Sequence, residues 1–215
     1  MVAKGSFYTI VCYFIVTLLL PQSSNAAEYV IDPSRSEMVV QVFKIGIGAV
    51  LAHDHVIRAT KYSGEVWVDP AEPSAARISV EVDATALVAD EAEIRQKYGL
   101  PLGLSEASRQ EIQQTLESES QLDVQRYPMI RFHSTSITPE GEGTYIVSGN
   151  LELRGVTRTI SLSLQGEIRN ETLRVTGSGR FLQSSFGYQP YSAFWGAVQN
   201  QDEVVLHVDI VAIGQ

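Results

Sequence analysis

The chain is poor in features that mark several large classes of protein. Its 215 residues include a single cysteine, Cys12, so no intramolecular disulfide is expected. Its 16 lysines and arginines face 25 aspartates and glutamates, giving a formal net charge of −9, and they form no basic cluster. Such a chain is a poor partner for nucleic acid or for an anionic membrane surface. The ordinary interpretation of the charge is solubility.

Only one long apolar run is present, and it lies near the N-terminus. Residues 7–20 are predominantly apolar, Lys4 precedes them, and a short polar stretch leads to Ala26. This pattern is typical of a signal peptide over residues 1–26, and it predicts export to the periplasm or the medium. The run is shorter than the roughly 18–20 residues of a spanning helix, so no stable membrane span is expected. An uncleaved anchor is the alternative. Residues 27–215, which follow the signal segment, are expected to form one domain.

Catalytic signatures are missing as well. The sequence has no G-x-S-x-G elbow and no phosphate-binding glycine loop between a strand and a helix. The glutamates of residues 90–119 could form paired carboxylates, but exposed helix faces are usually charged. We therefore do not expect an enzyme, and we expect no cofactor.

Alternation of apolar and polar residues dominates the rest of the chain. Ile78, Val80 and Val82 alternate with polar residues, and the same pattern recurs in later segments. Each pattern places one strand face on an apolar interior and the other in water. The expected strands cover residues 29–31, 37–45, 50–57, 62–68, 77–83, 129–137, 144–153, 159–164, 172–181 and 204–210. Their short connections predict an all-β, antiparallel fold, either a mostly closed barrel or a sandwich.

A helical insert is expected at about residues 90–119. Gly99 would end its first helix, and Ser108 with Glu111 form a capping box for a second helix from about Arg109 to Glu119. Ile112 and Leu116 would share one face of that second helix. Because this apolar stripe needs a partner surface, we expect the insert to cover one end of the barrel.

Two segments carry a family resemblance. Residues 127–134 read Y-P-M-I-R-F-H-S, and residues 149–158 read G-N-L-E-L-R-G-V-T-R. In order and spacing they resemble the "YP-x-I-x-F-x-S" and "G-x-L-x-L-x-G-V-T" blocks of the YceI-like family. The start at residues 29–36 and the strand at 203–206 are similar to the family's opening and closing blocks. The resemblance therefore spans nearly all of the chain after the signal segment.

This resemblance implies a lipocalin-like antiparallel β-barrel of about eight strands that binds an amphiphile with a polyisoprenoid or other lipid tail. The apolar residues expected to face its lumen are Ile78, Val80, Val82, Ile130, Phe132, Val147, Leu151, Leu153, Ile160, Leu162, Leu164, Phe181, Leu206 and Val208. Alternation alone does not distinguish a lumen from a packed core. A stress-related or interaction barrel without a small molecule stays open as the alternative, and so does a homodimer.

His53 and His55 form the one candidate polar site. Residues i and i+2 of a strand share a face, so both imidazoles could contact a lipid head group or a metal ion such as zinc or copper. No third metal ligand is evident, because His133 and His207 lie on other strands with outward faces. Ordinary solvated histidines are the plainer interpretation. The aromatic segment 188–195 is either a loop packed over a barrel end or a gate or partner surface.

Overall fold

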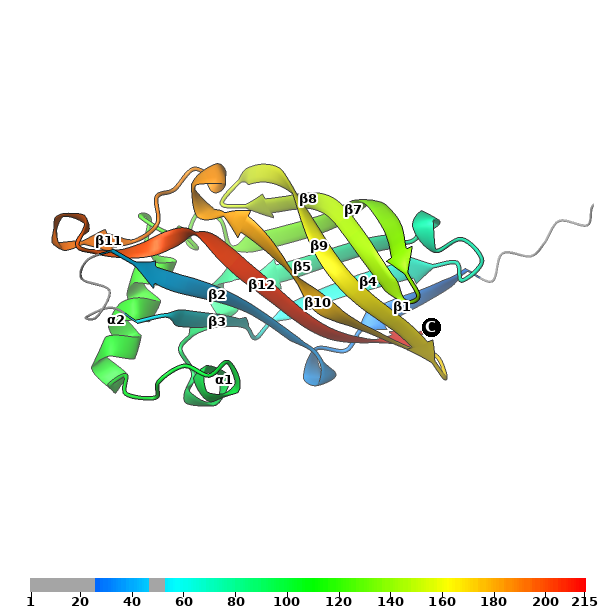
Figure 1. The fold of residues 1–215 in the computed structure, drawn as a ribbon, viewed down its shortest axis with the longest axis horizontal. Coiled ribbons are helices and arrows are strands. Elements are labelled where there is room, and N and C mark those ends of the chain that lie inside the picture. The colour runs from blue at the N-terminus through cyan, green and yellow to red at the C-terminus, as the bar shows by residue number, and fades with distance from the viewer. Residues whose placement is uncertain (1–25, 47–52) are drawn as a thin grey trace, which may run out of the picture.

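The computed structural model describes residues 26–46 and 53–215, and it is an antiparallel β-barrel with two helices (Figure 1). The predicted fold class is confirmed. The strands are β1 (Ala27–Ile31), β2 (Glu37–Ile45), β3 (His55–Ala59), β4 (Tyr62–Val68), β5 (Arg77–Asp83), β6 (Leu87–Ala89), β7 (Met129–Gly141), β8 (Thr144–Leu153), β9 (Val156–Arg169), β10 (Thr172–Leu182), β11 (Ser192–Ala193) and β12 (Val198–Gly214). The helices are α1 (Ala92–Lys97) and α2 (Glu106–Glu117).

The first six strands form three long strands, each broken in the middle. A 3₁₀ turn at Pro33–Arg35 separates β1 from β2, two residues separate β3 from β4, and a 3₁₀ turn at Ala84–Ala86 separates β5 from β6. The halves keep the same neighbours, because β4 pairs with β1 and β5 while β3 pairs with β2 and β6. With β7, β8, β9, β10 and β12, they make a barrel of eight sequential strands.

The last strand closes the barrel. β12 pairs along one edge with β10, for example Leu206 with Gly179. Along its other edge it pairs first with β2 and then with β1, for example Val208 with Met38 and Gly214 with Tyr29. Closure removes the free strand edges that an open sheet would expose.

Among the described strands, the barrel wall is left unpaired between β6 and β7. β7 pairs with β5 from Met129 to His133, and β6 has β3 as its only strand partner within the described residues. Both helices lie between β6 and β7 in the chain, and α2 lies at the end of the barrel opposite the C-terminus (Figure 1). The insert therefore occupies the place where strand pairing stops.

The helical insert differs from its prediction in detail. α2 begins three residues earlier than expected, because the hydroxyl of Ser105, and not that of Ser108, accepts a hydrogen bond from a free backbone N–H of the first turn. The predicted Ser108–Glu111 capping box is wrong. The predicted end of the first helix is correct, since Gly99 follows α1 with a left-handed φ of 71°.

Two other predictions concern residues that lie partly outside the described ranges. The predicted signal peptide falls outside the described residues except for Ala26, as do residues 50–52 of the predicted strand 50–57.

In the described part of the chain, neither helix is long and apolar enough to cross a membrane. Strand β6 was not predicted, because three residues are too few to show alternation.

Candidate ligand-binding cavity

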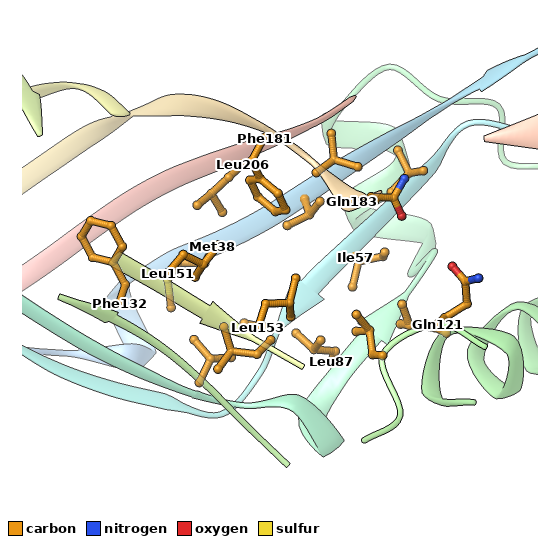
Figure 2. A pocket seen from close by; sticks show the side chains of 18 of the residues that line it. Met38, Ile57, Leu87, Gln121, Phe132, Leu151, Leu153, Phe181, Gln183 and Leu206 are labelled. Atoms are coloured by element: carbon orange, nitrogen blue, oxygen red, sulfur yellow. The ribbon is translucent and has the colours of Figure 1, made fainter. Parts of the chain in front are cut away.

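The barrel interior holds an apolar cavity of about 160 Å³. Its walls come from the inward faces of most barrel strands and from the segment that follows α2. It is lined by Met38, Val40, Val42, Ile57, Ala59, Val80, Val82, Leu87, Leu116, Gln121, Leu122, Ile130, Phe132, Leu151, Leu153, Phe181, Gln183, Tyr188, Val204 and Leu206. Figure 2 shows Gln121 and Gln183 at the end near the helix, with Phe132 at the opposite end. The end of the cavity at Phe132 is thus apolar, and the end near the helix carries the amide groups of Gln121 and Gln183.

The predicted lumen residues divide into three groups. Eight line this cavity: Val80, Val82, Ile130, Phe132, Leu151, Leu153, Phe181 and Leu206. Ile78, Val147 and Leu164 line a separate cavity, and Ile160, Leu162 and Val208 pack in the hydrophobic core. The interior is therefore partly a cavity and partly a packed core. Neither an open lumen nor a packed core describes the whole barrel.

Several lining residues were not predicted. Met38, Val40 and Val42 alternate along β2, so the signal for them was present in the sequence. Leu116 lies on α2, and Gln121 and Leu122 follow that helix, so no strand periodicity could have assigned them to a barrel interior.

The cavity continues into a wider mouth of about 290 Å³, whose lining mixes apolar and polar side chains and is more polar than that of the cavity. The two spaces share five lining residues: Val42, Ile57, Leu116, Gln121 and Gln183. One side of the mouth is formed by α2, through Ser108, Glu111, Ile112 and Thr115. The predicted Ile112–Leu116 face therefore lies over this end of the barrel, as expected.

Both predicted histidines line the mouth. His53 is exposed, yet partial desolvation of its imidazole, together with the nearby charge of His55, lowers its pKa. His55 is fixed, because its Nδ1 atom lies 2.6 Å from a carboxylate oxygen of Asp90. His133 is exposed on β7, and His207 contacts Gln41 and Tyr98, so neither joins the pair.

Asp90 is the centre of a buried charged network that the sequence did not reveal. It is wholly buried and bonded to Arg95 Nη1 at 2.5 Å, and the Val56 N–H also donates to its carboxylate. Burial opposes ionisation of Asp90, yet the bonds from His55 and Arg95 outweigh it and hold its pKa below the usual value. Arg95 also donates to the backbone oxygens of Asp54 and Pro101. This network ties β3 to α1 beside the mouth.

Metal ligation finds little support in this geometry. Within residues 26–46 and 53–215, no three His, Cys, Asp or Glu side chains are grouped so that they could hold a metal ion. Moreover, one nitrogen of His55 is already engaged by Asp90.

Comparison with known proteins assigns the family. A model described as the YceI-like domain matches residues 29–212. The chain belongs to the YceI-like family. Among curated YceI-like relatives, it is 28% identical to a UPF0312 protein of Shewanella baltica strain OS155 over 148 residues. That match covers 68% of this chain and 66% of the relative, slightly less than two thirds of its length. A UPF0312 protein of Shewanella oneidensis is 27% identical, with 68% and 65% covered.

Solved YceI-like structures share the fold at low identity. The crystal structure of Burkholderia cenocepacia BcnA has a TM-score of 0.63 and 18% identity, with 84% of this chain and 98% of that chain covered. The Campylobacter jejuni YCEI protein has a TM-score of 0.55 and 15% identity, with 74% and 84% covered. These likenesses support the barrel, and a YceI-like barrel is consistent with a binding protein.

This YceI-like barrel also has a second apolar cavity, of about 230 Å³. It shares no lining residue with the first and is lined partly by the turn after β4, including Pro70 and Pro73. Packed core residues such as Ile160 and Leu162 line neither space. The cavity near α2 is thus the one that opens through a polar mouth beside the two histidines.

Proposed function

We propose that the protein is an exported lipid-binding protein, a carrier or scavenger that holds an amphiphile by its polyisoprenoid or other long apolar tail. The observation that carries the proposal is the apolar cavity that opens into a polar mouth. Such a gradient matches a molecule with an apolar tail and a polar head. Transfer of the tail from water gains about 25 cal/mol per Å² of apolar surface before association costs.

The size of the space sets the mode of binding. At about 160 Å³ the cavity alone is smaller than the roughly 300–1,000 Å³ of sites that enclose drug-sized ligands. The adjoining mouth, at about 290 Å³, brings the shared space into that range. We therefore expect the tail end to fill the cavity while the rest of the ligand lies in the mouth against α2.

His55 is the side chain best placed to contact the head group. Because Nδ1 is bonded to the carboxylate of Asp90, the ring is held in place, and Nε2 is the ring nitrogen left to contact a ligand at the mouth. His53 and the amides of Gln121 and Gln183 supply further polar groups nearby. In this proposal the histidine pair contacts the head group and holds no metal.

A binding role fits this site better than catalysis does. Nucleophilic catalysis requires a nucleophile within hydrogen-bond reach of its base. Among the described residues no hydroxyl hydrogen-bonds to either mouth histidine; Ser108, which also lines the mouth, bonds to Ser105.

The test is to purify the protein without detergent after export, extract it with an apolar solvent and identify bound molecules by mass spectrometry. We expect an amphiphile with a long apolar tail in about equimolar amount. A matched extract of the Leu151→Glu variant, which places a charge in the cavity wall, should lack it if that variant folds. A folded wild-type protein that yields no such molecule, and takes up none when incubated with isoprenoid lipids, would contradict the proposal.

A further inference from the structure

The hairpin between β11 and β12 exposes two large aromatic side chains to water. Trp195 is fully exposed and Phe194 is 76% exposed. They form the tip of a four-residue loop closed by the pairing of Ala193 with Val198. Figure 1 shows this hairpin projecting beyond the barrel at the end where α2 lies. We refer to Phe194 and Trp195 as the aromatic tip.

The backbone of the aromatic tip is strained. Phe194 has a φ of 50° and Trp195 a φ of 59°, and Gly196 follows at 87°. Left-handed turns of this kind favour Asn, Asp and Gly, and bulky residues adopt them at a cost in free energy. No buried contact offsets that cost, because both side chains point into solvent. A structural role within this chain therefore does not explain the aromatic residues.

The chain segment that carries the tip is uncharged. Residues 181–201 contain no Asp, Glu, Lys, Arg or His, although the chain as a whole has a net charge of −9. Ile45, another large apolar residue with an exposed side chain, lies beside the hairpin because β2 pairs there with Gln199 of β12. The hairpin itself thus presents apolar and aromatic surface without charge, and Lys44 of β2 pairs with Asn200 at its base.

The same hairpin borders the mouth of the cavity. Tyr191, Val198 and Asn200 line the mouth, on both sides of the aromatic tip in the chain. Trp and Tyr are enriched where protein surface meets the interface of a lipid bilayer, since their rings are amphipathic. We propose that the aromatic tip inserts into the interface of an uncharged, zwitterionic bilayer and so places the mouth against the membrane.

The choice of a bilayer over a protein partner rests on the proposed lipid-binding function, because a mouth that faces a membrane gives a lipid a path that avoids water. The choice of zwitterionic lipid rests on charge alone. An acidic chain with an uncharged tip gains nothing from anionic head groups, which normally strengthen interfacial binding through basic residues.

Tryptophan fluorescence can test membrane insertion directly. The chain has two tryptophans, Trp67 and Trp195, so a Trp67→Phe variant reports on the tip alone. With phosphatidylcholine vesicles we expect its emission to shift to shorter wavelength and to be quenched by brominated acyl chains. Replacing part of the phosphatidylcholine with phosphatidylglycerol should leave binding equal or weaker. An unchanged spectrum at saturating vesicle concentration would overturn the proposal.

Matched variants then separate the tip from the rest of the surface. Phe194→Ser/Trp195→Ser should lower the vesicle partition coefficient by about tenfold or more, whereas Ile168→Ser, at a partly exposed site on β9 beside the second cavity, should not. Thermal unfolding should show that both variants are folded. Equal partitioning of all three proteins would overturn the proposal, as would a blue shift that depends on protein concentration without vesicles, which would indicate a second copy as the partner.

Failure of this proposal can be distinguished from failure of the proposed function. Uptake of an apolar probe by the cavity, measured without vesicles, should be the same in the wild type and the tip variant, because neither Phe194 nor Trp195 lines the cavity or the mouth. Probe uptake without vesicle binding would reject the membrane contact and leave the cavity function intact. Vesicle binding without probe uptake would reject the cavity function and leave the membrane contact intact.

Discussion

The imidazole of His55, which lines the mouth, is bonded at 2.6 Å to the wholly buried carboxylate of Asp90. Asp90 has no exposed surface, and its second oxygen accepts from Arg95, which is itself only 2% exposed. A side chain at the mouth is thereby oriented by a charge pair that solvent does not reach.

Removing the Asp90 charge should destabilise the fold. Asp90→Asn leaves the Arg95 guanidinium buried without its counter-charge, and breaking a buried pair in this way costs about 3 kcal/mol or more. Urea unfolding measures the loss. Asp209→Asn is the matched control, since its partner Arg174 is largely exposed and surface pairs contribute less than about 1 kcal/mol. Equal losses in the two variants would show that burial of Asp90 has no energetic consequence.

The same carboxylate should make the protein sensitive to acid. The pKa of Asp90 in the folded protein lies below its ordinary 3.8, so the unfolded chain takes up the proton first as the pH falls. Its contribution to stability is therefore complete above the unfolded value and is lost as the pH falls through the lower folded value. Between about pH 5 and pH 2, the free energy of unfolding of the wild type should fall more steeply than that of Asp90→Asn. Parallel curves would contradict this prediction.

Filling the cavity should block ligand binding without unfolding the barrel. Val40 lines the cavity on β2, and Val40→Phe adds volume where free space exists. We expect the affinity for an apolar fluorescent probe to fall by about tenfold or more. Val175→Phe makes the same change in the second cavity and should leave that affinity unchanged. If Val175→Phe reduces binding as much as Val40→Phe does, the ligand uses the other end of the barrel.

The apolar face of α2 should slow ligand release. Ile112 lines the mouth, whereas Gln114 lies exposed on the same helix. Ile112→Ser removes apolar contact with a ligand in the mouth, so its dissociation rate should rise by about tenfold, mostly without a change in association rate. Gln114→Ser should behave as the wild type in a stopped-flow displacement experiment. Identical rates in both variants would mean that α2 is a structural cover with no part in retention.

A glycine inside the barrel should not tolerate a methyl group. A Cβ at Gly149 would lie 2.4 Å from Cζ of Phe132 and 2.6 Å from the carbonyl oxygen of His133. Gly149→Ala should therefore destabilise the protein by about 1–3 kcal/mol and displace the Phe132 ring that closes the cavity. Gly166→Ala is the control, because a Cβ there meets no atom closer than 3.8 Å. Calorimetry with the two variants should show a loss for Gly149→Ala only.

Alternation in the sequence predicted an antiparallel barrel or sandwich, and the family resemblance implied the barrel. Alternation places Val80, Phe132 and Leu151 on inward faces because a strand turns successive side chains to opposite sides, whatever the rest of the fold does. The block at residues 127–134 leads into β7, and the block at residues 149–158 covers the end of β8, the turn after it and the start of β9. Strand alternation and short sequence blocks can be recognised from the sequence because each depends only on neighbouring residues.

Other features depended on contacts between distant segments. Ser105 rather than Ser108 caps α2, since the choice between two neighbouring serines depends on how the chain enters the helix. Asp90, Arg95 and His55 form one network only because β3, β6 and α1 meet beside the mouth. Nothing in the spacing of these three residues indicates that they are in contact.

By itself, then, the sequence determined which face of each strand is apolar, and only the tertiary structure decided which apolar residues enclose a cavity. Val80 and Ile160 have the same alternating environment in the chain, yet Val80 lines the cavity while Ile160 packs in the core. The difference arises because free volume depends on all the side chains that meet across the barrel. Strand periodicity depends on one segment alone.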